Sequence, residues 1–293
     1  MIMTDTTGPH LETSYDAPLS IEEVEARVQD RRVRRRSRAR ISAVIYPVMT
    51  VIGTLAAWEF ATRAFDIPAY LLPAPSEIAV SLVGNAALIL KHGWVTTIEI
   101  VLGFFLSIVV GVPLALAIFM WPAFSRSVLP LLVSSQAMPK VAVAPLFLVW
   151  FGFGLLPKVL IAFLIAFFPI VIGTAVGLAS IEQEKIHLAR SMGLGTAATF
   201  FKIRLPSALP SVFGGLKISI TLAVVGAVVG EFVGGDAGLG YLLMVANGNI
   251  DTPLLFAGLV ALTVQGVVLF FLVELVERLA IPRQTAAAVA GLA

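Results

Sequence analysis

The most unusual ionisable side chain in this sequence is Lys140, which lies in a long apolar stretch between Pro139 and Pro145. A charge at membrane depth is costly, so such a residue is a candidate for function. The flanking prolines free backbone carbonyl groups, which adds polar groups beside the lysine. A buried cation in this setting could attract an anionic solute. The alternatives are that Lys140 reaches out to the membrane surface, or that it pairs with an acid such as Glu99 or Glu231.

Polar residues near Lys140 extend this candidate site. Glu231 ends another apolar stretch, directly before the sequence GGDAGLG, where a gating role and a structural role are equally open. The glycines that follow it favour a hinge or a tight turn. We predict that the substrate pathway includes Ser134, Ser135, Gln136, Lys140 and Glu231.

The chain offers no chemistry typical of an enzyme or a metal site. It has no cysteine, and its histidines, His10, His92 and His187, are far apart in the sequence. No combination of nucleophile and base stands out, and no glycine-rich phosphate loop occurs. We therefore expect no catalytic residue, no metal and no cofactor in this chain.

The composition is that of an integral membrane protein. Of the 293 residues, 58% are hydrophobic and 13% are charged, whereas soluble domains carry about 25% charged residues. Residues 1–40 differ, because they hold seven acids and eight arginines. We expect a hydrophilic arm here, disordered at first, with Ser20 and Glu23 opening a helix. Its basic end before an apolar stretch indicates membrane topology and lipid anchoring rather than nucleic-acid binding.

Six stretches are long enough to cross a bilayer, since about 20 apolar residues are needed. They predict an all-α polytopic bundle with spans at 41–65, 94–120, 127–151, 157–180, 211–232 and 253–277. The runs 78–90 and 237–246 are too short, so we expect interfacial or re-entrant helices there, the first capped by Ser76.

Smaller features predict contacts between these spans. Gly173 with Gly177 and Gly226 with Gly230 favour close helix packing, either within one chain or between two. Glu59 with Arg63 predicts a structural ion pair, because the two residues are one helical turn apart. Gln265 predicts an interhelical hydrogen bond rather than a substrate contact.

Basic residues orient the bundle. With both termini in the cytoplasm, 15 of the 20 lysines and arginines lie on the cytoplasmic side, as the positive-inside rule requires. This arrangement gives a cytoplasmic arm at 1–40, a membrane domain at 41–283 and a cytoplasmic tail at 284–293. It also places the polar segment 181–210 in the cytoplasm, between the fourth and fifth spans.

Segment 181–210 has the pattern of two short helices. The first, EQEKIHLARSM, is expected to end at Gly193 or Gly195, because both glycines suit the position after a helix. Thr196 is expected to cap a second helix, which Pro206 stops. Pro210 then marks entry into the next span. A rigid small helix beyond the membrane suits docking into a groove of a partner.

This segment resembles the EAA loop of ABC-importer permeases, which docks the transporter's ATPase. Its glycine half and its Leu-Pro half match the family pattern, whereas His187 stands at the glutamate position, and either His187 or Glu184 could take over that role. The resemblance implies an ATPase-coupling loop formed by His187, Ala189, Gly193, Gly195, Phe200, Ile203, Leu205 and Pro206.

From about Leu71 to Pro282 the chain is similar to the nitrate, sulfonate and taurine branch of these permeases. LPAPSEI, MPKVAVAPLFLVWFGFG, FFPIVIGTAVGL and GEFVGGDAGLGYLL carry the likeness. The resemblance implies a type I importer subunit of the bacterial inner membrane, with a second permease chain in a homodimer. It also implies two ABC ATPase subunits and an extracytoplasmic binding protein that delivers a small anionic solute.

The alternative of a different class is an ion-coupled secondary transporter. Such a protein needs acidic coupling groups deep in the bundle. Glu59, Glu99 and Glu231 are expected near the outer ends of their spans instead.

Overall fold

The computed structural model describes residues 45–281, and within this range the regular structure is entirely helical. The chain divides into two compact units, residues 1–60 and 61–293. A helix over residues 45–64 begins in the first unit, within the expected span 41–65. The predictions for the arm 1–40, including Ser20 and Glu23, and for the tail 284–293 lie outside the described residues.

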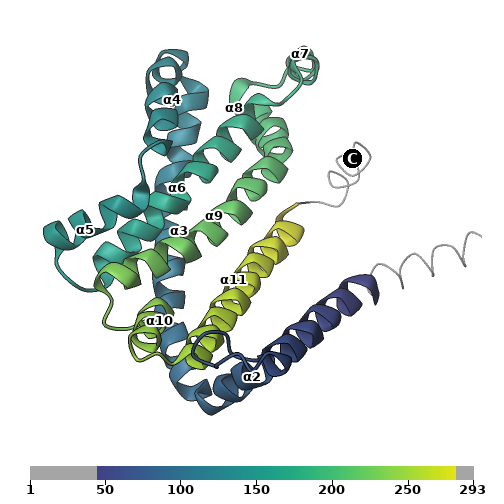
Figure 1. Ribbon diagram of the computed structural model, residues 1–293. Coiled ribbons are helices and arrows are strands. Elements are labelled where there is room, and N and C mark those ends of the chain that lie inside the picture. The colour runs from purple at the N-terminus through teal and green to yellow at the C-terminus, as the bar shows by residue number, and fades with distance from the viewer. Residues whose placement is uncertain (1–44, 282–293) are drawn as a thin grey trace, which may run out of the picture. The chain divides into compact units, whose positions relative to one another are not determined.

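The second unit is a bundle of long and short helices (Figure 1). Their order is α2 (Pro75–Gly84), α3 (Ala86–Met120), α4 (Pro122–Gln136), α5 (Lys140–Phe151), α6 (Leu155–Ala179), α7 (Gln183–Ser191), α8 (Thr196–Thr199), a π-helical turn η1 (Phe200–Arg204), α9 (Leu205–Gly234), α10 (Leu239–Gly248) and α11 (Thr252–Ala280).

Four of the described helical segments are long and apolar enough to cross a membrane, or five if one sharply bent helix pair counts as a span. They are α3, α6, the continuous segment from α8 to α9, and α11, which match four of the predicted spans. The protein is thus an all-α, multi-pass membrane protein. The count of six spans and the cytoplasmic placement of both termini stay predictions.

The predicted third span, 127–151, is wrong as a single helix. Helices α4 and α5 meet there at an angle of 96°, with Pro139 as the residue before α5. A proline clashes with the carbonyl one turn earlier and disfavours helical geometry in the residue before it. The helix therefore breaks at Ala137–Pro139, and Lys140 begins a new helix instead of lying in the middle of a span.

Helices α2 and α10 are short, with ten residues each. The predicted run 78–90 is divided between α2 and α3, because a break at Asn85 separates them. Ser76 is not the cap of α2. Ala74 holds that position, its N–H donating to Glu77 Oε2 at 2.9 Å, and Pro75 begins the helix. The predicted run 237–246 corresponds to α10, which is shifted by two residues.

Helix α6 lies between α3 and α9, and glycines let the three backbones approach closely. A Cβ atom on Gly226 of α9 would lie 2.5 Å from Ala162 Cα of α6, and one on Gly103 of α3 would lie 2.5 Å from Ala162 Cβ. A Cβ atom on Gly173 of α6 would likewise lie 3.0 Å from Gly215 Cα of α9. The predicted small-residue packing at Gly173 and Gly226 therefore occurs within one chain.

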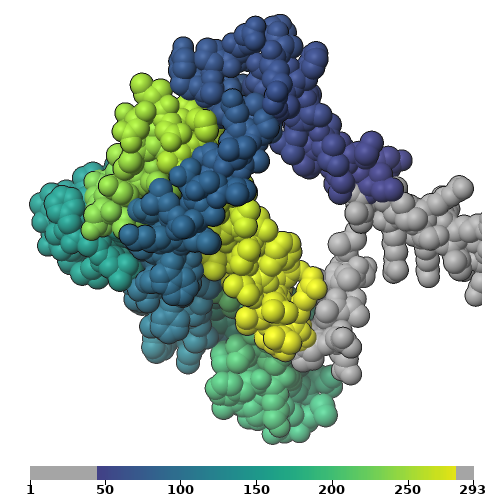
Figure 2. All heavy atoms as spheres, turned by 90° about the horizontal axis from the view of Figure 1, so that it is seen from below, coloured from purple at the N-terminus to yellow at the C-terminus, as the bar shows by residue number. Residues whose placement is uncertain are grey.

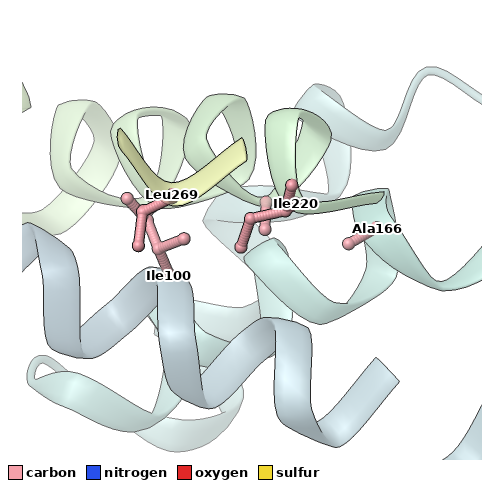
Figure 3. Close-up of a cluster of buried hydrophobic side chains, with 6 residues drawn as sticks. Ile100, Ala166, Ile220 and Leu269 are labelled. Atoms are coloured by element: carbon pink, nitrogen blue, oxygen red, sulfur yellow. The ribbon is translucent and has the colours of Figure 1, made fainter. Parts of the chain in front are cut away.

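An apolar cluster joins these helices to α11, as Figure 3 shows for Ile100, Ala166, Ile220 and Leu269. Polar side chains add cross-links between helices. Ser219 Oγ donates to the Ala166 carbonyl at 2.7 Å. Gln265 Nε2 donates to Thr97 Oγ1 at 2.7 Å and to the Gly93 carbonyl at 3.1 Å, which confirms its predicted interhelical hydrogen bond.

Candidate functional site: coupling segment, broken helix and polar cluster

The segment between α6 and α9 begins with α7, whose end is set by Gly193. The Gly193 N–H donates to the Arg190 carbonyl at 2.9 Å, and the Leu194 N–H donates to the Ala189 carbonyl at 3.1 Å. This pair of bonds is the Schellman motif, which needs a left-handed residue after the helix. Gly193 supplies it with φ of +80°. Of the two predicted helix-ending glycines, Gly193 has this role, and Gly195 instead precedes α8.

Two predictions for the second half of the segment are wrong. The residue before α8 is Gly195, so Thr196 is not the cap. Pro206 does not stop the helix, which runs without interruption from Thr196 to Gly234. The π-helical turn η1 accounts for this continuity, because the Leu205 N–H bonds to the Phe200 carbonyl five residues back. The wider turn makes room for a proline ring. Pro206 has no backbone N–H, so it leaves no unpaired donor in the helix. Pro210 lies inside α9 and does not mark its start.

The surface of the segment combines apolar and charged side chains. Leu188, Met192 and Phe201 are 63%, 72% and 64% exposed, and the neighbouring Arg190 and Lys202 are also exposed. Ala189 is buried, whereas His187 is exposed on the outside of α7. Apolar side chains with this exposure, rimmed by charge, are typical of a protein–protein contact.

The base of the segment is attached to the bundle. The Arg204 guanidinium lies over the Phe119 ring at the end of α3, with 5.0 Å between the guanidinium carbon and the ring centroid. Phe200 and Phe201 pack edge to face at 5.2 Å between ring centroids. Phe200, Ile203, Leu205 and Pro206 are all half-buried. The matched residues of the second helix thus form the stem of the segment.

The predicted pathway residues fall into two separate groups. Ser134, Ser135 and Gln136 form the last turn of α4 and are exposed, and Lys140 is the first residue of α5, half-buried. They lie on either side of the 96° bend. Glu231 is not part of this group, because it is buried at the far end of α9.

Glu231 takes part in capping the start of α10. Three consecutive backbone N–H groups there donate to side chains of other helices, since α10 has no side-chain cap of its own. Gly238 donates to His92 Nδ1 at 3.0 Å, Leu239 donates to Thr96 Oγ1 at 2.8 Å, and Gly240 donates to Glu231 Oε2. A helix start otherwise leaves such donors unpaired, and it favours a nearby negative charge.

These capping side chains lie close together at one end of the bundle. His92 stacks on Tyr241 of α10 at 5.9 Å between ring centroids. The Thr96 hydroxyl lies 2.6 Å from Glu231 Oε1. Seen from this end, α10 in yellow-green lies directly against α3 in blue (Figure 2). Glycine is required at Gly240, where a Cβ would lie 2.7 Å from Glu231 Oε2.

A buried lysine completes the cluster. Lys158 Nζ lies 3.1 Å from Glu99 Oε1, and these side chains are 3% and 0% exposed. It also lies 3.6 Å from Asp236 Oδ1 and 3.4 Å from the Ala237 carbonyl, both in the turn before α10. The suggested pairing of Lys140 with Glu99 or Glu231 is therefore wrong, because Lys158 is the lysine that Glu99 contacts.

Sequence reasoning missed Lys158, although a signal was present. The residue stands at the start of a predicted span, at the same expected depth as Glu99 and Glu231. Ionised acids buried near one end of an apolar bundle are commonly paired with a cation at that level. The stripe His92, Thr96, Glu99 on one face of a helix was a second signal, because residues three or four apart lie side by side.

The described part of the chain combines long apolar helices, one sharply bent helix pair, and an exposed two-helix segment at one end. The chain belongs to the family of binding-protein-dependent transport system inner membrane components, whose model matches residues 103–284.

Relatives of known name are similar over most of their length. The riboflavin transport system permease protein of Chloroflexus aurantiacus is 39% identical over 253 residues, which are 85% of this chain and 93% of that protein. The formylaminopyrimidine transport permease protein of Halalkalibacterium halodurans is 36% identical over 237 residues, covering 80% and 94%. The taurine transport system permease protein of Escherichia coli is 28% identical over 236 residues, covering 76% and 84%.

A solved structure shows the same fold. The inward-facing MetNI methionine ABC transporter matches 67% of this chain and 97% of its own chain, with a TM-score of 0.57 and 22% sequence identity.

These findings establish the class of the protein. It is an inner-membrane permease subunit of an ABC importer, with relatives that include permeases of the sulfonate and taurine branch, and these relatives are transport subunits rather than enzymes, because the ATPase is a separate subunit. Family membership implies ATPase and binding-protein partners. The alternative of an ion-coupled secondary transporter has no support from it.

Proposed function

We propose that this permease forms the pathway for a small anionic solute of the sulfonate, taurine, nitrate or aromatic-acid type. The observation that carries the proposal is the break between α4 and α5. Lys140 is the first residue of α5, so its charge adds to the positive end of the helix dipole. Transporters commonly direct such half-helix N-termini at anionic groups of their substrates. Ser134, Ser135 and Gln136 supply exposed hydrogen-bonding groups on the other side of the break.

The proposed assembly follows the family. Two copies of this chain form a homodimer in the bacterial inner membrane, and an extracytoplasmic binding protein delivers the solute. Two ABC ATPase subunits, which bind ATP and magnesium, dock on residues 181–210. The exposed Leu188, Met192 and Phe201 support this docking role, because they give the segment an apolar surface at the partner's expected position.

A second candidate substrate class is a flat nitrogen heterocycle. Two relatives named for riboflavin and formylaminopyrimidine transport are 39% and 36% identical to this chain, against 28% for the taurine permease. Pathway residues that recognise a heterocycle would depend less on a cation at Lys140.

The test is solute uptake into liposomes that contain the permease, its ATPase and its binding protein. We expect Lys140→Met to lower uptake of an alkanesulfonate about tenfold, since a hydrogen bond to a charged group contributes about 1.5–3 kcal/mol. ATPase co-purification should stay unchanged. Lys140→Arg should retain more uptake than Lys140→Met, and Lys91→Met, an exposed lysine on α3, serves as the control.

The two substrate classes give different results in this assay. Sulfonate uptake that is lowered in Lys140→Met and kept in Lys91→Met supports the anion. Riboflavin uptake that is insensitive to Lys140→Met, with no sulfonate uptake by the unaltered protein, contradicts the anion and favours the heterocycle.

A further inference from the structure

The hydrogen bonds around Glu231 favour an ionised carboxylate. Its Oε2 accepts from the Gly240 N–H, and its Oε1 lies 2.6 Å from the Thr96 hydroxyl. That hydroxyl already accepts from the Leu239 N–H, so its single proton is free to be donated. It lies closer to Glu231 than to the His92 carbonyl, which is 3.2 Å away. Both carboxyl oxygens of Glu231 therefore act as acceptors, as in a carboxylate.

Glu99 has the opposite hydrogen-bond pattern. Its side chain is fully buried, and apart from the ion-pair contact of Oε1 with Lys158, neither oxygen has a hydrogen-bond partner among the described residues. Glu99 lies one helical turn after Thr96 on α3, and the Thr96 hydroxyl contacts Glu231. Lys158, which Glu99 contacts, packs against Gly230 next to Glu231. The two carboxyl groups therefore belong to one buried cluster. A carboxyl group with a spare oxygen beside a carboxylate can lower the energy of both by donating a proton to it.

Counting charges in the cluster leads to the same result. The buried groups are the two carboxyls of Glu99 and Glu231 and one ammonium, that of Lys158. Two ionised acids would leave one negative charge uncompensated in a low-dielectric site, which is costly. The other groups that face the cluster do not remove this charge. Asp236 is acidic and exposed, and His92 Nδ1 accepts a hydrogen bond from Gly238, so this nitrogen carries no proton. Tyr241 stacks on the His92 ring.

The position of the cluster connects it to transport. Lys158 lies in the first turn of α6 and Glu231 in the last turn of α9. At their opposite ends these two helices lead into and out of residues 181–210, the proposed coupling segment (Figure 1). They also pack backbone to backbone, with a Cβ on Gly230 predicted to lie 3.0 Å from Lys158 Cα. Because α6 and α9 are packed this tightly, a displacement of the two helices at residues 181–210 is transmitted to Glu99 and the start of α10 at their other ends.

We propose that Glu99, Lys158 and Glu231 form a latch, in which a proton on Glu99 joins the two carboxyl groups, and that this latch positions α10 and its preceding glycine turn during solute translocation. The three are positioning residues, which act through α10 and do not contact the solute. The inference rests on the proposed coupling role of residues 181–210. Buried ion pairs can often be replaced by apolar residues without loss of stability, so a requirement for this charge arrangement points to a defined conformation instead.

The experiment compares isosteric variants in the full complex of permease, ATPase and binding protein. Glu99→Gln keeps a donor for Glu231 and an acceptor for Lys158, so we expect it to retain most of the uptake. Glu231→Gln removes the negative charge at the start of α10 and leaves one acceptor oxygen instead of two, so uptake should fall about tenfold, as expected for loss of a charge-assisted hydrogen bond. Glu274→Gln, which affects a partly exposed pair with Arg278 on α11, is the matched control.

Two further measurements test the latch independently of activity. The infrared carbonyl band of a buried protonated carboxylic acid should be present in the unaltered protein, lost in Glu99→Gln and kept in Glu274→Gln. A spin label on Met244→Cys, an exposed position of α10, should become more mobile in Glu231→Gln and in Lys158→Met.

The ion pair can also be tested by exchanging its two residues. The double variant Glu99→Lys with Lys158→Glu should recover part of the uptake that Lys158→Met loses.

The outcomes separate the latch from the coupling role. Equal loss of uptake in Glu99→Gln and Glu231→Gln, or an unchanged infrared band in Glu99→Gln, overturns the placement of the proton. Normal uptake in Glu231→Gln and in Lys158→Met overturns the latch. ATPase co-purification should be kept in every latch variant. If variants of the coupling segment also leave ATPase co-purification unchanged, the coupling role is wrong. The infrared test of the proton on Glu99 does not depend on that outcome.

Discussion

At the scale of the residue, Gly193 is the position in the coupling segment where glycine has a specific backbone reason. Its φ of +80° closes the Schellman motif at the end of α7. A side chain there costs about 1 kcal/mol or more, because Cβ approaches the carbonyl oxygen in the left-handed region. We expect Gly193→Ala to lower ATPase co-purification several-fold, while membrane insertion is unchanged. The measurement is the ratio of ATPase to permease after affinity purification.

The segment provides its own controls for this prediction. Gly193→Asn should be milder, because asparagine tolerates the left-handed region better. Gly195, two residues on, has an ordinary negative φ of −67° and open space around its Cβ position, so Gly195→Ala should bind ATPase normally. Equal effects of Gly193→Ala and Gly195→Ala would show that backbone geometry is not the cause.

How far sequence reasoning reached differs among these residues. Gly193 was predictable, because a glycine after a short amphipathic run is a local signal. Lys158 was not identified, because its partner Glu99 is 59 positions earlier in the sequence and only folding brings them together. The same limit applies to the capping of α10, where His92 and Gly238 are separated by 146 positions. Local patterns reveal helix ends, whereas contacts between distant segments need the packed bundle.

At the scale of the element, the contact between α6 and α9 depends on small residues. A Cβ on Gly226 would lie 2.5 Å from the Ala162 Cα, which is backbone and cannot rotate away. We expect Gly226→Ala to separate the two helices and to destabilise the protein by about 1–3 kcal/mol, as overpacking does. The midpoint of thermal unfolding in detergent, followed by circular dichroism, should fall.

A matched substitution on the same helix distinguishes packing from glycine chemistry. Gly214 of α9 has no atom within 4 Å of its Cβ position. Gly214→Ala should therefore keep or raise the unfolding midpoint, since alanine favours a helix by about 1 kcal/mol relative to glycine. If both variants lower the midpoint by the same amount, the close approach to Ala162 is not what requires glycine at Gly226.

Element boundaries show which physical effects a sequence pattern hides. Prolines marked two places where we expected a helix to end or begin, at Pro206 and Pro210, yet the helix from Thr196 to Gly234 contains both. A π-helical turn and missing N–H donors accommodate them, and propensity rules do not include such compensation. At Pro139 the opposite occurred, because an apolar stretch long enough for one span is bent by 96°. The hydropathy pattern predicts the length of an apolar segment, but it does not predict whether the segment bends.

At the scale of the whole molecule, α6 and α9 run between two chemically different ends. Lys185, Arg190 and Lys202 belong to the coupling segment at one end, whereas Asp236 and Asp251 lie near α10 at the other. Basic segments stay on the cytoplasmic side when a membrane protein inserts. The charge difference between the two ends therefore predicts which end of the bundle faces the ATPase and which faces the binding protein.

This orientation can be tested directly because the chain has no cysteine. Single cysteines at exposed positions, Asn249→Cys after α10 and Gln183→Cys at the start of α7, mark the two ends without a background signal. In right-side-out vesicles a membrane-impermeant maleimide should label Asn249→Cys and leave Gln183→Cys unlabelled, and in inverted vesicles the pattern should reverse. Detergent, which exposes both sides, should allow labelling of both variants. Labelling of Gln183→Cys in right-side-out vesicles would place the coupling segment outside, where no ATPase can reach it.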